Sequence, residues 1–202
     1  MNPMRRTIDI LVAAVVLGLL APLMVLVALA VVLDSRGNPF YLAERCGLQS
    51  RRFRMWKFRT MAANAGSAGS AITGNRDPRI TRLGRILRVS KIDELPQFVN
   101  VLLGDMTLVG PRPEAPSIVA LYSPEQRRVL EVKPGITGRV QLSAEESEMI
   151  PAGAEPEEYY VTHLMPNKLR SDLEYLATRS PWSDVRIVFD TLGFVFRALV
   201  HR

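Results

Sequence analysis

The stretch Arg85–Glu114 organises this chain, and it reads RILRVSKIDELPQFVNVLLGDMTLVGPRPE. Two adjacent carboxylates, Asp93 and Glu94, come just before Pro96. Because proline is tolerated in the first turn of a helix, where its missing N–H would have no partner, we expect a helix to begin here with Asp93 at or near its N-cap. The unpaired N–H groups and the positive dipole end of a helix start favour a bound anion such as a phosphoryl group.

The end of the same stretch presents a fixed cation. Pro111 and Pro113 restrict the backbone on both sides of Arg112, whose planar guanidinium matches phosphate geometry. The acidic pair and this cation therefore predict a phosphate site. A purely structural interpretation stays open, because acidic residues in a first helical turn stabilise the helix dipole, and Ser90 with Asp93 would form a plain capping box.

Three strings in this stretch are KIDELPQ, NVLLGDM and VGPRPE. Their order and spacing strongly resemble the bacterial sugar transferase family, the monotopic phosphoglycosyl transferases, which are polyprenyl-phosphate hexose-1-phosphate transferases. The resemblance implies transfer of a sugar-1-phosphate from a UDP-sugar to undecaprenyl phosphate, with release of UMP. It also implies the first membrane step in assembling a glycoconjugate, such as an O-antigen, a capsule, an exopolysaccharide or a glycoprotein glycan.

The resemblance also implies roles for individual residues. Asp93 is expected to attack the β-phosphorus and form an aspartyl phosphosugar. Glu94 is expected to bind Mg²⁺ or to position and deprotonate the acceptor. The cofactor Mg²⁺, held by Glu94 and Asp93, would help to neutralise the diphosphate. Four cations, two of them in the string KFRTM, are expected to bind substrate phosphate: Arg112, Arg88, Lys57 and Arg59.

The turn KPGITG at Lys133–Gly138 is also similar to the family, and we expect it to lead into a short strand that ends at Gln141. Its glycines permit positive φ in a tight turn. The family's usual sequence after this turn is only partly kept. Thr137, Gly138 and Gln141 are expected to contact the nucleotide or the sugar, and the sequence does not identify which sugar is transferred.

The net charge and the numbers of cysteines and histidines limit the classes of partner and metal that the chain can bind. The chain has 202 residues and a net charge of +6, with a pI near 9.9, so an anionic partner is expected. The single cysteine, Cys46, excludes an intrachain disulfide and a cysteine-rich metal site, and the two histidines do not make a histidine metal cluster. Any metal should therefore be a hard cation bound by oxygen.

The segment Ile10–Leu33 carries no charge and, as a continuous helix of about 36 Å, could cross a hydrocarbon core of about 30 Å. A cleavable signal peptide is the alternative, because Arg5 and Arg6 precede the segment. Basic residues lie on both flanks, so the positive-inside rule draws both ends to the cytoplasm. Pro22 removes a helical hydrogen bond and should bend the helix. We therefore predict a re-entrant helix, which the family resemblance also implies, although Ala21 replaces the serine common there.

The predicted fold is α+β and helix-rich. It comprises a small globular domain with a short β-hairpin around Gly47, the kinked re-entrant membrane helix at the N-terminus, and interfacial amphipathic helices. Two domains are expected: residues 1–36 form the membrane helix hairpin, and residues 37–202 form a catalytic domain on the cytoplasmic face of the bacterial inner membrane. Apolar residues from Trp182 onward repeat at helical spacing, and we favour a helix in the membrane interface over core packing. Since no other apolar segment precedes the first, the extra spans of larger relatives should be absent.

Two other classes of function stay open. A membrane-tethered lipid phosphate hydrolase would use similar chemistry, but the sequence has no Gly-x-Ser-x-Gly elbow and no Walker loop. A basic module that binds headgroups or nucleic acid would explain the charge, yet not the acidic pair or the proline-flanked Arg112. The expected partners are a UDP-sugar, undecaprenyl phosphate and membrane lipids, without nucleic acid, and the oligomeric state is open.

Overall fold

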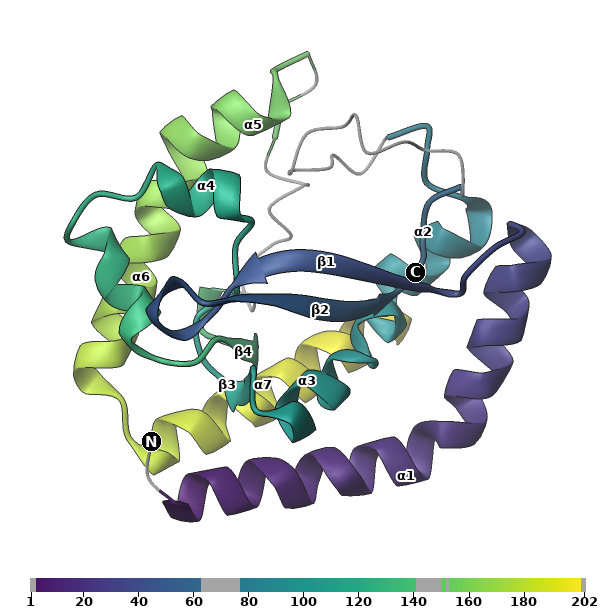
Figure 1. Ribbon diagram of the computed structural model, residues 1–202, viewed down its shortest axis with the longest axis horizontal. Coiled ribbons are helices and arrows are strands. Elements are labelled where there is room, and N and C mark those ends of the chain that lie inside the picture. Colours follow the sequence, from purple (N-terminus) through teal and green to yellow (C-terminus); the bar gives the residue numbers. More distant parts are fainter. Residues whose placement is uncertain (1–2, 63–76, 141–149, 152, 201–202) are drawn as a thin grey trace.

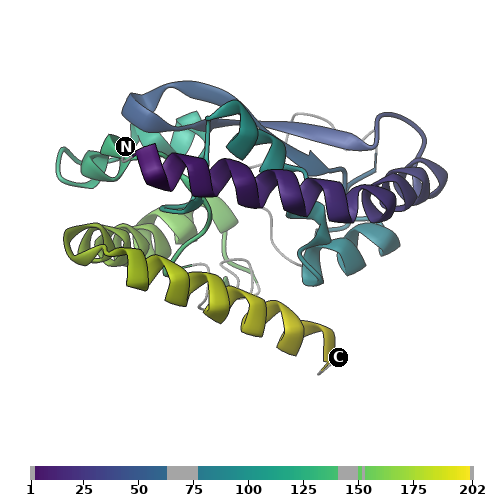
Figure 2. The same ribbon diagram turned by 90° about the horizontal axis from the view of Figure 1, so that it is seen from below.

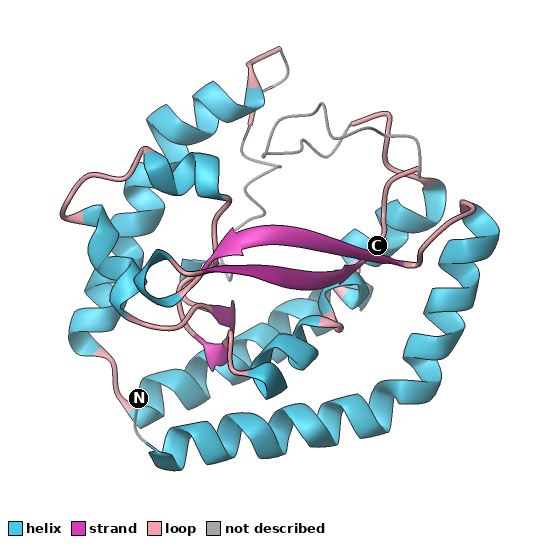
Figure 3. Cartoon of the chain, viewed as in Figure 1, coloured by secondary structure: helices cyan, strands magenta, loops and turns pink. Residues whose placement is uncertain are grey.

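The computed structural model describes residues 3–62, 77–140, 150–151 and 153–200. Helices dominate the described part (Figure 3). The α-helices are α1 (Pro3–Asp34), α2 (Arg82–Val89), α3 (Gln97–Leu103), α4 (Pro116–Ala120), α5 (Pro156–Tyr159), α6 (Met165–Thr178) and α7 (Pro181–Val200). Shorter turns are the 3₁₀ segments η1 (Leu48–Ser50), η2 (Ile92–Glu94) and η3 (Gln126–Glu131) and the π-helical segment η6 (Tyr160–Leu164).

Two small sheets complete the fold. Strand β1 (Phe40–Cys46) pairs antiparallel with β2 (Arg52–Phe58), and β3 (Thr107–Val109) pairs in parallel with β4 (Gly135–Thr137). The first pair is the predicted hairpin around Gly47. The helix-rich class with a short hairpin and one long apolar N-terminal helix is therefore confirmed.

Helix α1 contains Pro22 and bends sharply into two arms (Figure 1). Proline cannot donate to the carbonyl four residues earlier and its ring clashes with that turn, which accounts for the bend. By length and composition, α1 is the one helix among the described residues that could cross a membrane. The predicted kink is confirmed, whereas the placement of the helix in a membrane stays a prediction.

Both arms of α1 contact the same globular body. Ala13, in the first arm, is fully buried in a cluster with Met55 of β2 and Val101 of α3. Val31, in the second arm, is buried against Phe58 at the end of β2. The apolar helix therefore bends around the globular part, and it keeps contact with it before and after the bend.

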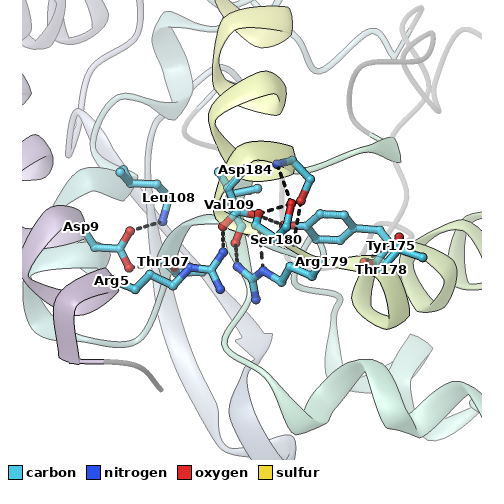
Figure 4. Close-up of polar contacts among 11 residues, drawn as sticks. Arg5, Asp9, Thr107, Leu108, Val109, Tyr175, Thr178, Arg179, Ser180 and Asp184 are labelled. Atoms are coloured by element: carbon cyan, nitrogen blue, oxygen red, sulfur yellow. Dashed lines mark hydrogen bonds and ion pairs between the residues drawn. The ribbon is translucent and has the colours of Figure 1, made fainter.

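Polar contacts attach the start of α1 to β3 and α7 (Figure 4). Arg5 forms an ion pair with Asp184 of α7. The buried carboxylate of Asp9 accepts hydrogen bonds from the Thr107 hydroxyl at 2.6 Å and from the Leu108 N–H at 3.3 Å. The charged residues ahead of the apolar segment are thus bonded to the globular part.

The two ends of α1 are fixed by arginines. Arg6 donates to the carbonyls of Val101 at 2.6 Å and Leu102 at 3.0 Å. These carbonyls belong to the last turn of α3, where the Val101 carbonyl also accepts from the Gly104 N–H at 3.1 Å. At the other end of α1, the Arg59 guanidinium donates to the Ser35 carbonyl. Both ends of α1 are therefore hydrogen-bonded to the same body.

The parallel pair of β3 and β4 was not expected from the sequence. It brings two backbones very close, because a Cβ on Gly135 would lie 2.1 Å from the Gly110 nitrogen. The glycines of the KPGITG segment permit positive φ, but neither Gly135 nor Gly138 adopts it. Among the described residues, the glycines with positive φ are Gly37, Gly104 and Gly153. Glycine is required at position 135 because a side chain would clash with the neighbouring strand, and not because the backbone has an unusual φ.

Helix α7 leaves much of its apolar stripe uncovered. Ile187 is buried, whereas Trp182 is 81% exposed, Phe189 is 68% exposed and Phe196 is 67% exposed. Figure 2 shows α1 between the β1–β2 hairpin and α7 in the view from below. Core packing is therefore wrong for these three aromatic residues, and the interfacial placement of α7 stays a prediction.

Candidate active site

The acidic pair lies in η2, between α2 and α3. Helix α3 begins at Gln97, immediately after Pro96, so the proline marks a helix start as predicted. Asp93 lies near the start of α3, as expected, but the N-cap residue is Pro96 and the Asp93 side chain does not cap the helix. Lys91, with a left-handed φ of 59°, caps η2, and no side chain bonds to the backbone at the N-cap of η2 or α3. A 3₁₀ hydrogen bond from the Glu94 N–H to the Lys91 carbonyl closes the turn instead.

The capping-box interpretation of Ser90 and Asp93 is also wrong. The Ser90 hydroxyl donates to the carbonyls of Ile86 at 2.8 Å and Leu87 at 3.2 Å. These bonds belong to the end of α2. Ser90 therefore closes the preceding helix and leaves the Asp93 carboxylate uninvolved.

Glu94 joins two of the predicted phosphate-binding cations. Lys57 Nζ lies 2.9 Å from Glu94 Oε1, and Arg112 Nη2 donates to the same oxygen at 2.6 Å. Lys57 comes from β2 and Arg112 from the segment after β3. Burial opposes the ionised form, but Arg112 and Lys57 outweigh it and hold the pKa of Glu94 well below its usual value. Glu94 is therefore a charged, clamped carboxylate at neutral pH.

Asp93 has a different environment. It is 6% exposed, and its carboxylate has no hydrogen bond to any other residue that the structure describes. Burial, with a smaller contribution from Glu94, raises the pKa of Asp93 to about 6, against the opposing charges of Lys57, Lys91 and Arg88. Environments that separate the pKa values of neighbouring carboxylates are typical of active sites. Asp93 is the less solvated and less restrained member of the pair.

Arg88 reaches the same region from α2. Its charge acts on Asp93, and its Nε donates to the Thr60 hydroxyl at 2.9 Å. A Cβ on Gly84 would lie 2.0 Å from the Thr60 carbonyl oxygen, so α2 packs directly on the chain after β2. Arg59, the fourth predicted cation, donates to a carbonyl at the end of α1. The structure thus brings Arg88 to the acidic pair and gives Arg59 a partner elsewhere.

Thr137, one of the residues expected to contact the nucleotide or sugar, lies beside α7. Thr137 ends β4, and its hydroxyl lies 2.7 Å from the Thr191 hydroxyl of α7. Gly138 follows and is buried. Gln141 lies outside the described residues. Strand β4 occupies Gly135–Thr137, inside the predicted turn, whereas Arg139 and Val140, expected in the strand after that turn, are not in a strand. Within the described part of the chain, no hydrogen bond joins Thr137 to the acidic pair.

Asn100 is a buried residue that the sequence interpretation missed. Its Oδ1 accepts from the Trp56 N–H at 2.9 Å, and its Nδ2 donates to the Arg54 carbonyl at 2.8 Å. These bonds join α3 to β2 beside Lys57, and so they fix the lysine relative to the acidic pair. The available signal was a single amide within the apolar run Phe98–Leu103.

A second buried cluster lies behind Arg112. Tyr160 and Lys168 both donate to Glu114 Oε1, and Lys168 Nζ lies 2.9 Å from the Tyr160 hydroxyl. Burial opposes ionisation of Glu114, but Lys168 and the two hydrogen bonds lower its pKa. The cluster ties the segment that carries Arg112 to η6 and α6.

The described residues contain no group of three His, Cys, Asp or Glu side chains that could hold a metal ion. Mg²⁺ is commonly bound by one or two carboxylates together with substrate phosphates and water. Asp93 and Glu94 supply two carboxylates beside cations that suit phosphate. The pair therefore fits a magnesium ion that binds with a diphosphate, and it does not form a complete protein cage.

The fold and this site define a protein with a membrane-compatible helix packed on the body that carries an acidic pair among basic side chains. The chain belongs to the bacterial sugar transferase family, which it matches over residues 1–198. The predicted family is therefore confirmed.

Three relatives illustrate the similarity. The chain is 39% identical, over 93% of its length, to the UDP-glucose:undecaprenyl-phosphate glucose-1-phosphate transferase of Caulobacter vibrioides, of which it covers 68%. It is 35% identical, over 96% of its length, to the protein of that name from Escherichia coli K12 and covers 41% of it. It is 37% identical, over 93% of its length, to the UDP-N-acetylgalactosamine-undecaprenyl-phosphate N-acetylgalactosaminephosphotransferase of Aeromonas hydrophila and covers 42% of it. The chain thus spans less than half the length of the last two.

Proposed function

We propose that this chain transfers a sugar-1-phosphate from a UDP-sugar to undecaprenyl phosphate and releases UMP. The names of its relatives describe this kind of reaction. The observation that carries the proposal is the acidic pair itself. Its two carboxylates have opposite pKa shifts and lie among cations from β2, α2 and the segment after β3. The step would begin assembly of a bacterial glycoconjugate.

In the first half-reaction, Asp93 is the nucleophile. An ionised oxygen of Asp93 attacks the β-phosphorus, the bond to the bridging oxygen breaks, and UMP leaves with that oxygen. A pKa of about 6 leaves most of the Asp93 carboxylate ionised at pH 7, while burial limits its solvation. Lys57 and Arg112 bind the phosphate oxygens, and this binding competes with their contacts to Glu94.

In the second half-reaction, an oxygen of undecaprenyl phosphate attacks the same phosphorus. The acyl phosphate bond breaks, Asp93 is regenerated as a carboxylate, and a lipid-linked diphosphate sugar forms. Arg88 is our candidate for the lipid phosphate. It lies on α2 beside Leu87, which is buried against Val31 in the second arm of the apolar helix. A lipid that follows this arm would bring its phosphate toward Arg88.

Glu94, with Asp93, is proposed to hold Mg²⁺ together with the diphosphate. When bound, the ion would neutralise charge on the diphosphate. The low pKa of Glu94 supports this role over that of a general base, since a base with a pKa far below 7 takes up protons poorly. Thr137, Gly138 and Gln141 are kept as candidates for contact with the nucleotide or sugar.

We also propose a monotopic arrangement on the cytoplasmic face of the inner membrane, where UDP-sugars are available. Contacts of Arg6 and Arg59 bind both ends of α1 to one body, which supports entry and exit of this helix on one face. The exposed aromatic residues of α7 would lie at the headgroup level. The division into residues 1–36 and 37–202 stays a prediction.

The experiment is a product assay on the purified protein in lipid nanodiscs. UMP and lipid-linked sugar are measured with a panel of UDP-sugars, Mg²⁺ and undecaprenyl phosphate. We expect UMP release with at least one sugar and its loss in Asp93→Asn. The matched control is Asp190→Asn, the same change at an exposed position of α7, which should keep the full rate.

Two results would overturn the proposal. Release of inorganic phosphate in place of a lipid-linked diphosphate sugar would indicate a hydrolase. Salt-sensitive binding to anionic vesicles, with no UMP release for any UDP-sugar, would indicate a basic binding module.

A further inference from the structure

Gln97, the first residue of α3, has a buried donor without a partner. The side chain is 1% exposed, and within residues 3–62, 77–140, 150–151 and 153–200 its Nε2 atom has no hydrogen-bond partner. Leaving a buried polar group unpaired costs about 1–3 kcal/mol, and most buried side-chain amides are bonded. In the same parts of the chain, Arg59 Nε is the one other buried side-chain atom in this state. Packing alone does not explain the amide.

Gln97 lies beside the acidic pair. It follows Asp93 by four residues and Glu94 by three, and the backbone between them is helical through Leu95 and Pro96. Residues three and four apart on a helix are neighbours, with Cβ atoms about 5–6 Å apart. Helical side chains also lean toward the helix N-terminus. From this general geometry we infer that the Gln97 amide leans toward the turn that carries both carboxylates.

Neither carboxylate accepts a hydrogen bond from this amide. Glu94 is engaged by Lys57 and Arg112. Asp93 is buried, and it too has no hydrogen bond to another described residue. The Gln97 amide therefore has a donor without an acceptor, and the Asp93 carboxylate nearby has no hydrogen-bond donor among the described residues. A group bound to Asp93 that carries its own acceptor oxygens would give the amide its missing partner.

We propose that the Gln97 amide donates a hydrogen bond to a non-bridging oxygen of the phosphoryl group that Asp93 accepts. The inference rests on the proposed function. As the Asp93–phosphorus bond forms and UMP departs, charge on the non-bridging oxygens must be stabilised. A neutral amide does this without adding a cation that would bind Glu94. Gln97 itself gains and loses no proton, and it makes the same contact when the lipid phosphate resolves the intermediate.

The first test separates a catalytic contact from a structural one. Gln97→Met keeps a similar shape and removes the donor, so UMP release should fall by about 100-fold. Its midpoint of thermal unfolding should stay equal to wild type or rise, because an unpaired buried donor is removed. Asn100→Leu is the matched control, a bonded amide on the same helix, and it should lose stability and activity together. Loss of both properties in Gln97→Met would overturn the proposal.

The second test locates the contact. UDP-sugars with sulfur in place of one non-bridging β-phosphate oxygen exist as two diastereomers, and sulfur weakens a hydrogen bond to that position. In the wild type, UMP release from one diastereomer should be slower, because its sulfur replaces the oxygen that Gln97 contacts. In Gln97→Met this slowing should disappear, while the sulfur effect of the other diastereomer should persist. Unchanged sulfur effects for both diastereomers, or a wild-type rate in Gln97→Met, would contradict the proposal.

A second variant, Gln97→Glu, keeps the proposal testable if Gln97→Met folds poorly. Gln97→Glu keeps the shape and replaces the donor with a carboxylate that repels phosphate, so its UMP release should fall further than that of Gln97→Met. The outcome is distinct from failure of the proposed function. If Asp93→Asn is inactive and both Gln97 variants are fully active, the reaction stands and the role of Gln97 falls. If Asp93→Asn keeps its rate, the proposed function falls.

Discussion

Arg112 and Glu94 form a two-point contact in which Nη2 lies 2.6 Å from Oε1 and Nη1 lies 3.4 Å from Oε2. Lys57 shares Oε1 at 2.9 Å. The cations that suit a diphosphate are thus held in position by a carboxylate before any substrate binds. A substrate phosphate would replace the carboxylate as their partner when it binds, and because the cations are already in place they would reorganise little during the reaction.

The shape of the Arg112 side chain should matter as well as its charge. Arg112→Lys keeps the charge but loses the planar fork, so we expect a rise in KM of about 10-fold. Arg112→Ala also leaves Glu94 with Lys57 alone, and kcat/KM should fall by about 100-fold or more. Steady-state UMP release measures both. Arg186→Lys, at an exposed site on α7, is the control, and equal effects at the two positions would contradict this role.

The ionised carboxylate of Asp93 should destabilise the folded protein. Its pKa is raised from 3.8 to about 6, so the folded state binds the proton more tightly than the unfolded state. The associated stability is fully present below pH 3.8 and is lost as the pH rises through about 6. Asp93→Asn has no such loss, so at pH 8 it should exceed wild type by up to about 3 kcal/mol. Thermal unfolding at pH 8 and pH 5 checks this, and the difference should shrink at pH 5.

The rate of UMP release should depend on ionisation of Asp93. Because the nucleophile is the carboxylate, kcat/KM should rise with pH and level off above about 6. Lys57 lowers the pKa of Asp93, so Lys57→Met should move the midpoint to higher pH as well as reducing the rate. A profile that is flat between about pH 5 and 7.5 would contradict this assignment.

The cluster behind Arg112 should be sensitive to removal of one partner. Lys168→Met leaves the buried Glu114 carboxylate without its cation, and breaking such a pair costs about 3–5 kcal/mol. The double variant Lys168→Met/Glu114→Gln removes the isolated charge and should be more stable than Lys168→Met alone. Unfolding midpoints of the three variants test this coupling. A double variant less stable than the single one would exclude it.

Much of the candidate site was predictable because its residues lie in the strings that resemble the family. Asp93, Glu94, Arg112 and Lys57 meet in the structure, and the charge of Arg88 acts on Asp93. Their meeting was not predictable from spacing, since it depends on how β2 and the segment after β3 pack on η2. These long-range contacts are set by tertiary packing.

Other features carried weaker signals. Gln97 and Asn100 border or interrupt an apolar run, where periodicity predicts a buried helix but does not say what a buried amide contacts. The start of α3 was predicted to within a few residues, because Pro96 limits where a helix can begin. The reason for glycine at position 135 was not predictable, since the sequence of the segment does not reveal how closely Gly110 approaches it.

Covalent capture of the phosphosugar tests the central claim most directly. The protein is mixed with its active UDP-sugar and Mg²⁺ without undecaprenyl phosphate, quenched, digested and analysed by mass spectrometry. We predict one sugar phosphate on the peptide that contains Asp93, formed together with UMP and lost when undecaprenyl phosphate is added. A sugar phosphate on any other side chain, or a lipid product formed at the full rate by Asp93→Asn, would contradict it.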